Sequence, residues 1–102
     1  MSTDKNVGLT DLDKRLGRMT LASFLKSWRM SEGMTQAAFA RKLKLSPANL
    51  CDIEKGRKGV SPRKAADIAR RIGYSRRVLV ELAINDTLNA EGLRFRARVE
   101  VA

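Results

Sequence analysis

The sequence predicts an all-α domain of five short helices, followed by a single β-strand at the C-terminus. Five segments carry apolar residues three and four positions apart, which is the spacing of one helix face. Serine or threonine precedes four of these segments and glycine follows three, as expected for helix starts and helix ends. After residue 92 the apolar spacing changes to two, which indicates a strand.

The 102 residues provide for one domain with a modest core. We expect an N-terminal arm over residues 1–18, which can include a short accessory helix. The helical domain should follow over residues 19–90, and the strand over residues 91–102.

The first two helices follow from two apolar stripes. The first stripe consists of Leu21, Phe24, Leu25 and Trp28. Gly33 supplies the left-handed residue that ends this helix, and Thr35 caps the next one. The same spacing recurs at Gln36, Phe39, Ala40 and Leu43, with Phe39 and Leu43 turned toward the core.

The third helix has a narrow apolar stripe. Ser46 and Pro47 form a start signal, because proline lacks the amide hydrogen that a first helical turn does not use. Only Leu50 and Ile53 face the core before Gly56 ends the helix. Its outer face is therefore free for a ligand.

The fourth and fifth helices complete the domain. Ser61 and Pro62 repeat the start signal, and Gly73 ends a stripe made of Ala65, Ile68, Ala69 and Ile72. Ser75 caps the fifth helix, whose apolar band is too wide for one buried face and implies a second contact surface. The band consists of Val78, Leu79, Val80, Leu82, Ala83 and Ile84.

The alternating C-terminal segment places its apolar side chains on one side, and we expect these to form a dimer interface. They are Leu93, Phe95, Ala97, Val99 and Val101. A lone strand leaves its backbone groups unpaired, so we expect antiparallel pairing with a second copy across a two-fold axis. The alternative is a tail that folds over its own domain or frays.

Charge favours a nucleic-acid partner. Lysine and arginine number 21 against 11 acidic residues, which gives a formal charge of +10. A basic surface without a partner is the alternative reading of the same charge.

Several function classes are excluded. Cys51 is the only cysteine and there is no histidine, so an internal disulfide, a Cys/His zinc site and a Cys–His nucleophile pair cannot form. We interpret Cys51 as a packed residue and expect no enzyme activity, metal or cofactor. No apolar stretch approaches the roughly 18 residues of a membrane span, and residues 1–8 lack a signal-peptide core, so we expect a cytoplasmic protein without a membrane partner.

The stretch from Thr35 to Gly56 forms two short helices around a tight turn, with Ala40 at the close-packing position of the first and Leu50 on the second. It resembles the lambda-repressor-like (Cro/repressor, XRE) helix-turn-helix family. The likeness extends, with declining sharpness, from about Leu21 to Leu88. It implies a DNA-binding domain whose third helix enters the major groove.

The resemblance assigns roles to single residues. Gln36 matches a position that anchors to a backbone phosphate and braces the recognition helix. The base-reading positions are Pro47, Ala48, Asn49 and Asp52. Well-known members often carry glutamine at the first two positions, so contact with a thymine methyl is the option left there.

Two of the base-reading residues have alternatives. Asn49 is suited to adenine or to a phosphate. Asp52 is suited to the amino group of cytosine, or to a local pair with Lys55. Arg29 and Glu54 match positions that form a structural ion pair in several family members.

The remaining phosphate contacts are expected from the start of the third helix and the basic residues that follow it. They are Ser46, Lys55, Arg57, Lys58, Arg63 and Lys64. Their number predicts a strong dependence of DNA affinity on salt.

Two functions fit these features. The first is a homodimeric, sequence-specific transcriptional regulator, a repressor that occupies a palindromic operator on double-stranded DNA. The second is the antitoxin of a toxin-antitoxin pair, which binds a toxin protein and regulates its own operon. Only the N-terminal arm or the C-terminal tail offers a separate segment for such a toxin.

Overall fold

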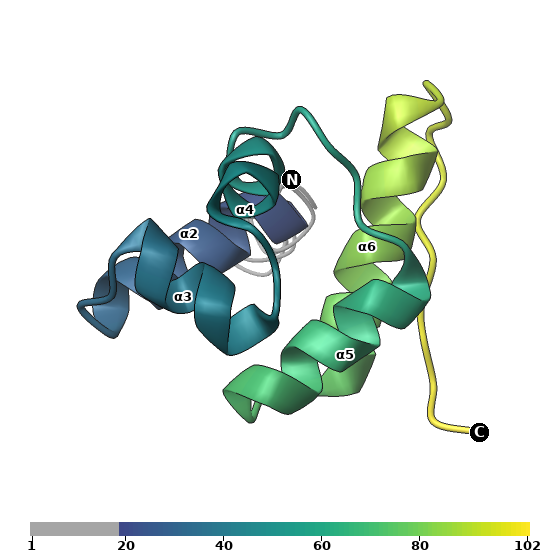
Figure 1. Cartoon of the computed structure of the whole chain (residues 1–102). Coiled ribbons are helices and arrows are strands. Elements are labelled where there is room, and N and C mark those ends of the chain that lie inside the picture. The colour runs from purple at the N-terminus through teal and green to yellow at the C-terminus, as the bar shows by residue number, and fades with distance from the viewer. Residues whose placement is uncertain (1–18) are drawn as a thin grey trace, which may run out of the picture.

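The computed structural model describes residues 19–102 and forms five α-helices followed by a C-terminal tail (Figure 1). The accessory helix expected within residues 1–18 lies outside the described residues. The helices are α2 (Leu21–Ser31), α3 (Gln36–Leu43), α4 (Pro47–Glu54), α5 (Pro62–Ile72) and α6 (Arg76–Ala90). The five predicted helices are confirmed.

Each helix begins directly after a hydroxyl residue, whose side-chain oxygen accepts a backbone N–H from the first turn. The caps are Thr20, Thr35, Ser46, Ser61 and Ser75. The cap at Thr20 is reciprocal, because the Ser23 hydroxyl also accepts the Thr20 N–H. Local signals therefore set the five start points.

The core joins all five helices. In Figure 1, α5 and α6 lie side by side, and α2, α3 and α4 form a cluster next to them. The largest fully buried side chains are Leu21, Leu25, Phe39, Leu43, Leu50, Ile68 and Leu79. Because each helix contributes to this cluster, α4 is held by long-range packing as well as by its own cap.

The turn between α3 and α4 contains a left-handed lysine. Lys44 ends α3 with φ 58° and ψ 45°, a conformation that glycine adopts at far lower cost. Its N–H and the N–H of Leu45 donate to carbonyls of the last turn, including a 2.8 Å bond from Leu45 to Ala40. These bonds reverse the chain tightly and set α4 against α3.

The C-terminal segment departs from the prediction, because residues 91–102 of this chain form no strand. The tail instead runs antiparallel along α6 (Figure 1). The Asn85 side chain accepts the Ala97 N–H at 2.7 Å and donates to the Ala97 carbonyl at 3.1 Å. Glu81 accepts the Val99 N–H at 2.9 Å. Two polar side chains of α6 thus provide the backbone partners that the prediction sought in a second strand.

The wide apolar band of α6 has two environments. Leu79 and Ala83 are buried in the core, whereas Val78, Val80 and Leu82 are half-buried against it. Ile84, the remaining member of the band, is half-buried and does not belong to this cluster. None of the helices that the structure describes has the length and apolar character to cross a membrane.

Candidate nucleic-acid interface

Helix α4 places one side in the core and leaves the other open. Leu50 and Ile53 are buried, whereas Pro47 and Ala48 at the N-terminus are exposed and Asn49 is half-buried. Ser46 caps the helix through the Asn49 N–H at 3.1 Å. A helix anchored in this way presents its first turn and its outer face to a ligand.

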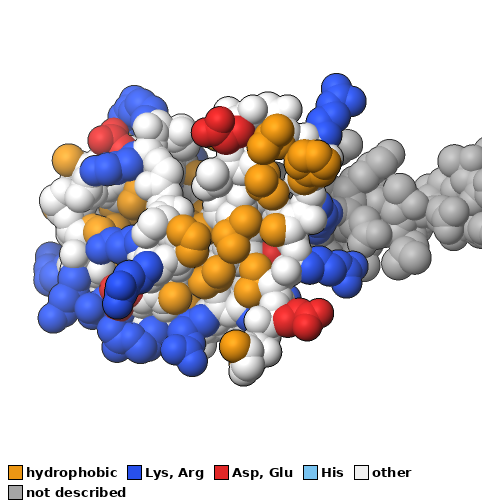
Figure 2. Space-filling view, turned by 90° about the vertical axis from the view of Figure 1, so that its right-hand side faces the viewer, with side chains coloured by type: hydrophobic (Ala, Val, Ile, Leu, Met, Phe, Trp, Pro, Cys, Tyr) orange, Lys and Arg blue, Asp and Glu red, His pale blue; other side chains and the backbone are white. Residues whose placement is uncertain are grey.

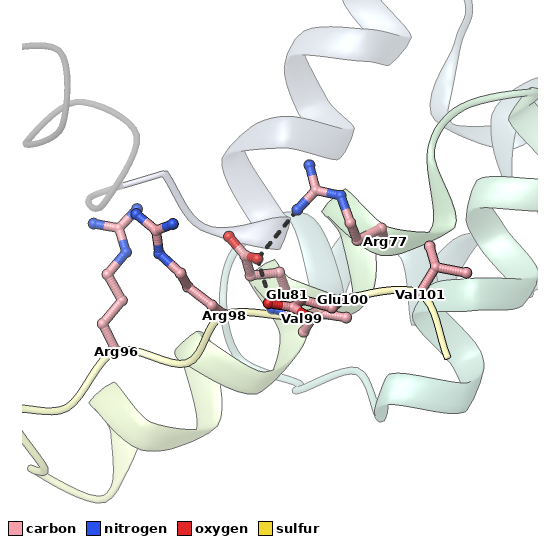
Figure 3. Close-up of a pocket in the computed structure, with 7 residues that line it drawn as sticks. All are labelled: Arg77, Glu81, Arg96, Arg98, Val99, Glu100 and Val101. Carbon is pink, nitrogen blue, oxygen red and sulfur yellow. Dashed lines mark hydrogen bonds and ion pairs between the residues drawn. The ribbon is translucent and has the colours of Figure 1, made fainter.

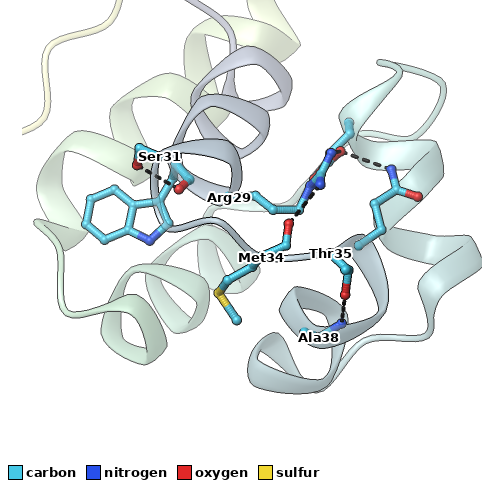
Figure 4. A network of polar contacts seen from close by, with 8 residues as sticks. Arg29, Ser31, Met34, Thr35 and Ala38 are labelled. Carbon is cyan, nitrogen blue, oxygen red and sulfur yellow. Dashed lines mark hydrogen bonds and ion pairs between the residues drawn. The ribbon is translucent and has the colours of Figure 1, made fainter.

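A polar network fixes α4 to the helices around it (Figure 4). Arg29 of α2 donates from Nε and Nη2 to the two carboxylate oxygens of Glu54, at 2.8 and 3.1 Å, and from Nη1 to the Met34 carbonyl at 3.0 Å. Gln36 of α3 donates from Nε2 to Glu54 Oε1 at 3.0 Å. The Glu54 side chain is only 3% exposed, so these bonds satisfy a carboxylate that water hardly reaches.

The same network leaves the N-terminus of α3 at the surface. Gln36 donates one amide hydrogen to Glu54, so its side chain braces α4. The Thr35 hydroxyl satisfies the Ala38 N–H, which leaves the earlier N–H groups of the first turn available for an anion.

The two polar side chains expected to read bases each contact a basic side chain from the loop that follows α4. Lys58 Nζ donates to Asn49 Oδ1. Arg57 Nε donates to Asp52 Oδ1 at 3.2 Å, and Arg57 Nη2 lies 3.1 Å from the same oxygen in an ion pair. The local partner of Asp52 is thus Arg57, five residues on, and not Lys55.

The other basic residues near α4 stay unpaired within the described part of the chain. Lys55 and Arg63 are exposed and Lys64 is half-buried at the start of α5. Among residues 19–102, the ion pairs of arginine and lysine involve Arg29, Arg57, Arg70, Arg71 and Arg77. Within residues 19–102, Lys55, Arg63 and Lys64 therefore form no ion pair.

The tail forms a second surface. Figure 3 shows Arg96 and Arg98 extending from the tail on the same side, with Glu81 between them and Arg77. Arg77 Nη1 donates to Glu81 Oε1 at 3.3 Å, and the same oxygen accepts the Val99 N–H. A cavity of about 640 Å³ lies along these residues.

The residues predicted to form the dimer interface divide into two groups. Ala97 and Val99 are half-buried against α6, whereas Leu93, Phe95 and Val101 are 44%, 72% and 85% exposed. Figure 2 shows hydrophobic side chains gathered on the face that carries α6 and the tail, with basic side chains around them. Leu93, Phe95 and Val101 in this region are exposed.

Two carboxyl groups have shifted pKa values. Hydrogen bonds from Arg71 and Arg70 hold the pKa of the Asp67 carboxyl below its ordinary value. Burial raises the pKa of the Asp86 carboxyl, against the opposing effect of the Leu21 N–H, which donates to Asp86 Oδ2 at 3.0 Å. The bond between Asp86 and Leu21 ties the end of α6 to the start of α2.

Sequence reasoning did not identify Glu81, Asn85 or Asp86 as structural residues. One signal was present, because Glu81 and Asn85 lie four residues apart and so share a face of a mostly apolar helix. That a tail would return to this face is a property of the tertiary structure. Within residues 19–102 there is no group of three or more side chains suited to hold a metal ion.

Five packed helices, with α3 and α4 joined by a tight turn and the outer face of α4 open, define a helix-turn-helix DNA-binding domain. A family model described as a helix-turn-helix domain matches residues 20–82, which is more than half of the chain. The chain belongs to this family, which is of the lambda-repressor (XRE) type. Membership implies that the protein binds DNA. No curated protein and no solved structure matches the chain.

Proposed function

We propose that the protein is a transcriptional repressor that binds a palindromic operator as a homodimer. The observation that carries this proposal is the position of α4, whose outer face is open while Glu54 at its other end is held by Arg29 and Gln36. A helix held rigidly at its base can enter the major groove without reordering, which favours sequence-specific binding.

Base reading is assigned to the exposed turn of α4. Pro47 and Ala48 are small and apolar, and their exposure suits contact with thymine methyl groups. Asn49 carries Lys58 on its oxygen but keeps both amide hydrogens, which leaves it able to donate to a base or a phosphate.

Phosphate binding is assigned to the helix starts and the unpaired cations. The N-termini of α3, at Gln36, and of α4, at Ser46, offer N–H groups and the positive end of a helix dipole. Lysine and arginine side chains extend this surface along the loop and the start of α5. They are Lys55, Lys58, Arg63 and Lys64.

The tail supplies the proposed dimer contact. In an extended chain, the backbone groups of neighbouring residues point to opposite sides. Because those of Ala97 and Val99 bond to α6, those of Arg96, Arg98 and Glu100 point outward. Within the described residues these three have no backbone hydrogen bond, so they form an open edge that a second copy can pair with.

One antiparallel register is self-complementary. When the two tails pair about Arg98, each Arg96 lies opposite Glu100 of the second copy, and each Phe95 lies opposite Val101. This register covers two of the most exposed apolar side chains. It also sets the two Arg98 side chains against each other, which costs part of the gain.

A dimer of this kind would place two recognition helices on half-sites about 34 Å apart along one face of the duplex. Steric exclusion of the polymerase is then sufficient for repression. The core of the described domain includes residues of the helix-turn-helix. Repression by occupation of the operator alone is therefore the simplest mechanism.

A second candidate function is that of an antitoxin. It is favoured by the apolar and basic face over α6 and the tail, which is separate from α4 and exposes Phe95 and Val101. In this reading the face binds a toxin protein instead of, or in addition to, a second copy. A toxin reading frame next to the gene, and a stable complex of the two purified products, would distinguish this function.

The test of DNA binding is selection of bound duplexes from random DNA, followed by affinity measurements at several salt concentrations. We expect an inverted repeat, and a loss of about a thousandfold in affinity between about 50 and 200 mM salt for 6–10 phosphate contacts in the dimer. Asn49→Ala should reduce sequence preference while salt-sensitive binding persists. Selection of no motif by the wild-type protein would refute sequence-specific binding.

A further inference from the structure

We propose that Asp52 is a positioning residue that holds Arg57 for recognition of a guanine, so that Arg57, outside the recognition helix, determines specificity. This inference rests on the proposed DNA-binding function and refines it. The resemblance to the family gives base reading to Asp52 itself, and the basic cluster after the third helix predicts phosphate binding by Arg57. The contacts around the two side chains favour a different division of work.

The loop after α4 folds back onto Asp52 through both main chain and side chain. The Asp52 carbonyl accepts the Arg57 N–H at 2.8 Å and the Lys58 N–H at 3.3 Å. The Asp52 carboxylate accepts Arg57 Nε–H at 3.2 Å, and the same oxygen lies 3.1 Å from Arg57 Nη2 in an ion pair. Arg57 makes three of these four contacts, through its N–H, Nε and Nη2, so it is held on Asp52 by hydrogen bonds as well as by charge.

The Arg57 guanidinium has N–H groups that do not face Asp52 and can donate to a ligand. Arginine has five N–H donors in a planar fork; the donor on Nε bonds to Asp52, and Nη2 lies 3.1 Å from the same carboxylate oxygen. The remaining donors include both hydrogens of Nη1 and the second hydrogen of Nη2. Two parallel donors on this edge match O6 and N7 of guanine, the pair that arginine reads in the major groove. The Arg57 side chain is 60% exposed, so this edge is open.

The carboxylate itself is poorly suited to direct reading. Its Oδ1 is occupied by Arg57, and a bare carboxylate beside phosphates is electrostatically costly. The negative charge of Asp52 also argues against Arg57 as a simple phosphate ligand, because a carboxylate next to the guanidinium weakens its attraction for phosphate. If Arg57 instead binds a base edge, the Asp52 carboxylate orients it and leaves the other N–H groups of its guanidinium available to the base.

The experiment compares selected motifs and affinities for the wild-type chain, Arg57→Lys, Asp52→Asn and the control Arg63→Ala. We expect wild type to select a guanine in each half-site. Arg57→Lys should lower the preference for that guanine by roughly tenfold to a hundredfold, because lysine lacks the planar fork. Asp52→Asn should weaken the preference at the same position, although it removes a negative charge and so favours phosphate attraction.

Arg63→Ala should instead weaken binding to all sequences similarly and reduce the salt dependence. A selected motif that is unchanged in Arg57→Lys, or a uniform loss of affinity in that variant, would overturn the inference and place Arg57 on a phosphate. A change in Asp52→Asn at a cytosine that Arg57→Lys leaves intact would return base reading to Asp52. If wild type selects no motif, the proposed function itself fails, which separates the two outcomes.

Discussion

Arg29 and Glu54 form a two-point ion pair that joins the first described helix to the end of the recognition helix. The two bonds measure 2.8 and 3.1 Å, and the side chains are 16% and 3% exposed. Because Gln36 also donates to this carboxylate, one acidic side chain holds α2, α3 and α4 together. The orientation of α4 thus depends on a largely buried ion pair.

Arg29→Ala should destabilise the fold by about 3–5 kcal/mol, because it strands the buried Glu54 carboxylate. The double variant Arg29→Met with Glu54→Leu should recover much of this loss, since no charge is left without a partner. Urea unfolding followed by circular dichroism measures both. Equal destabilisation by the single and double variants would show that packing, and not the stranded charge, dominates at this site.

Lys44→Gly should stabilise the protein by about 1 kcal/mol. Lys44 has φ 58° at the end of α3, where a side chain costs energy and glycine does not. The residue is exposed, so its replacement removes little packing. Lys42→Gly, within the same helix, is the matched control and should destabilise by a similar amount. A lower midpoint of thermal unfolding for Lys44→Gly would contradict the strain at this turn.

Asp86→Asn should alter the dependence of stability on pH in a defined direction. Burial raises the folded-state pKa of Asp86, so the folded chain binds its proton more readily than the unfolded chain. Wild type therefore loses stability, relative to the variant, as the pH rises from the ordinary value of 3.8 through the raised value.

Unfolding free energies of the two proteins, measured from about pH 3 to about pH 7, test this difference. Asp67, whose pKa is lowered, acts in the opposite direction, since its contribution is lost as the pH falls through its folded-state pKa. Its effect is common to both proteins and cancels. A difference that grows toward acid, with the variant more stable there, would reverse the predicted sign.

Changes in the tail should act on dimerisation. Deletion of residues 92–102 should produce a monomer in sedimentation and weaken operator binding sharply. Glu100→Lys leaves the tail in place but turns two attractive cross-strand pairs into repulsive ones, with a cost to the dimer of about 1–2 kcal/mol. Arg98→Thr removes the like-charge contact and should tighten the dimer.

These variants have a clear counter-result. If Glu100→Lys and Arg98→Thr shift the dimer equilibrium in the same direction, the proposed register is wrong. If the deleted chain remains a dimer, the tail is not the interface.

Much of the helical framework was predictable because its signals are local. A hydroxyl cap followed by proline at Ser46 and Ser61 specifies a helix start through a few backbone torsions and one hydrogen bond. The same holds for the apolar stripes, which need only helical spacing. The pairing of Arg29 with Glu54 came from likeness to a known family, since no local rule connects residues so far apart in the chain.

The C-terminal segment shows where local reasoning ends. Alternation predicted a strand, which residues 91–102 do not form. Asn85 and Glu81 bond to the backbone of the tail in the single chain, and no local pattern could identify them as its partners. In the same way, the sequence placed Asp52 on the outer face of α4, while the fold of the loop decided that Arg57 lies on it. Caps and periodicity depend on neighbours a few residues away, whereas these contacts depend on how separate elements approach in space, and that is decided only when the core is packed.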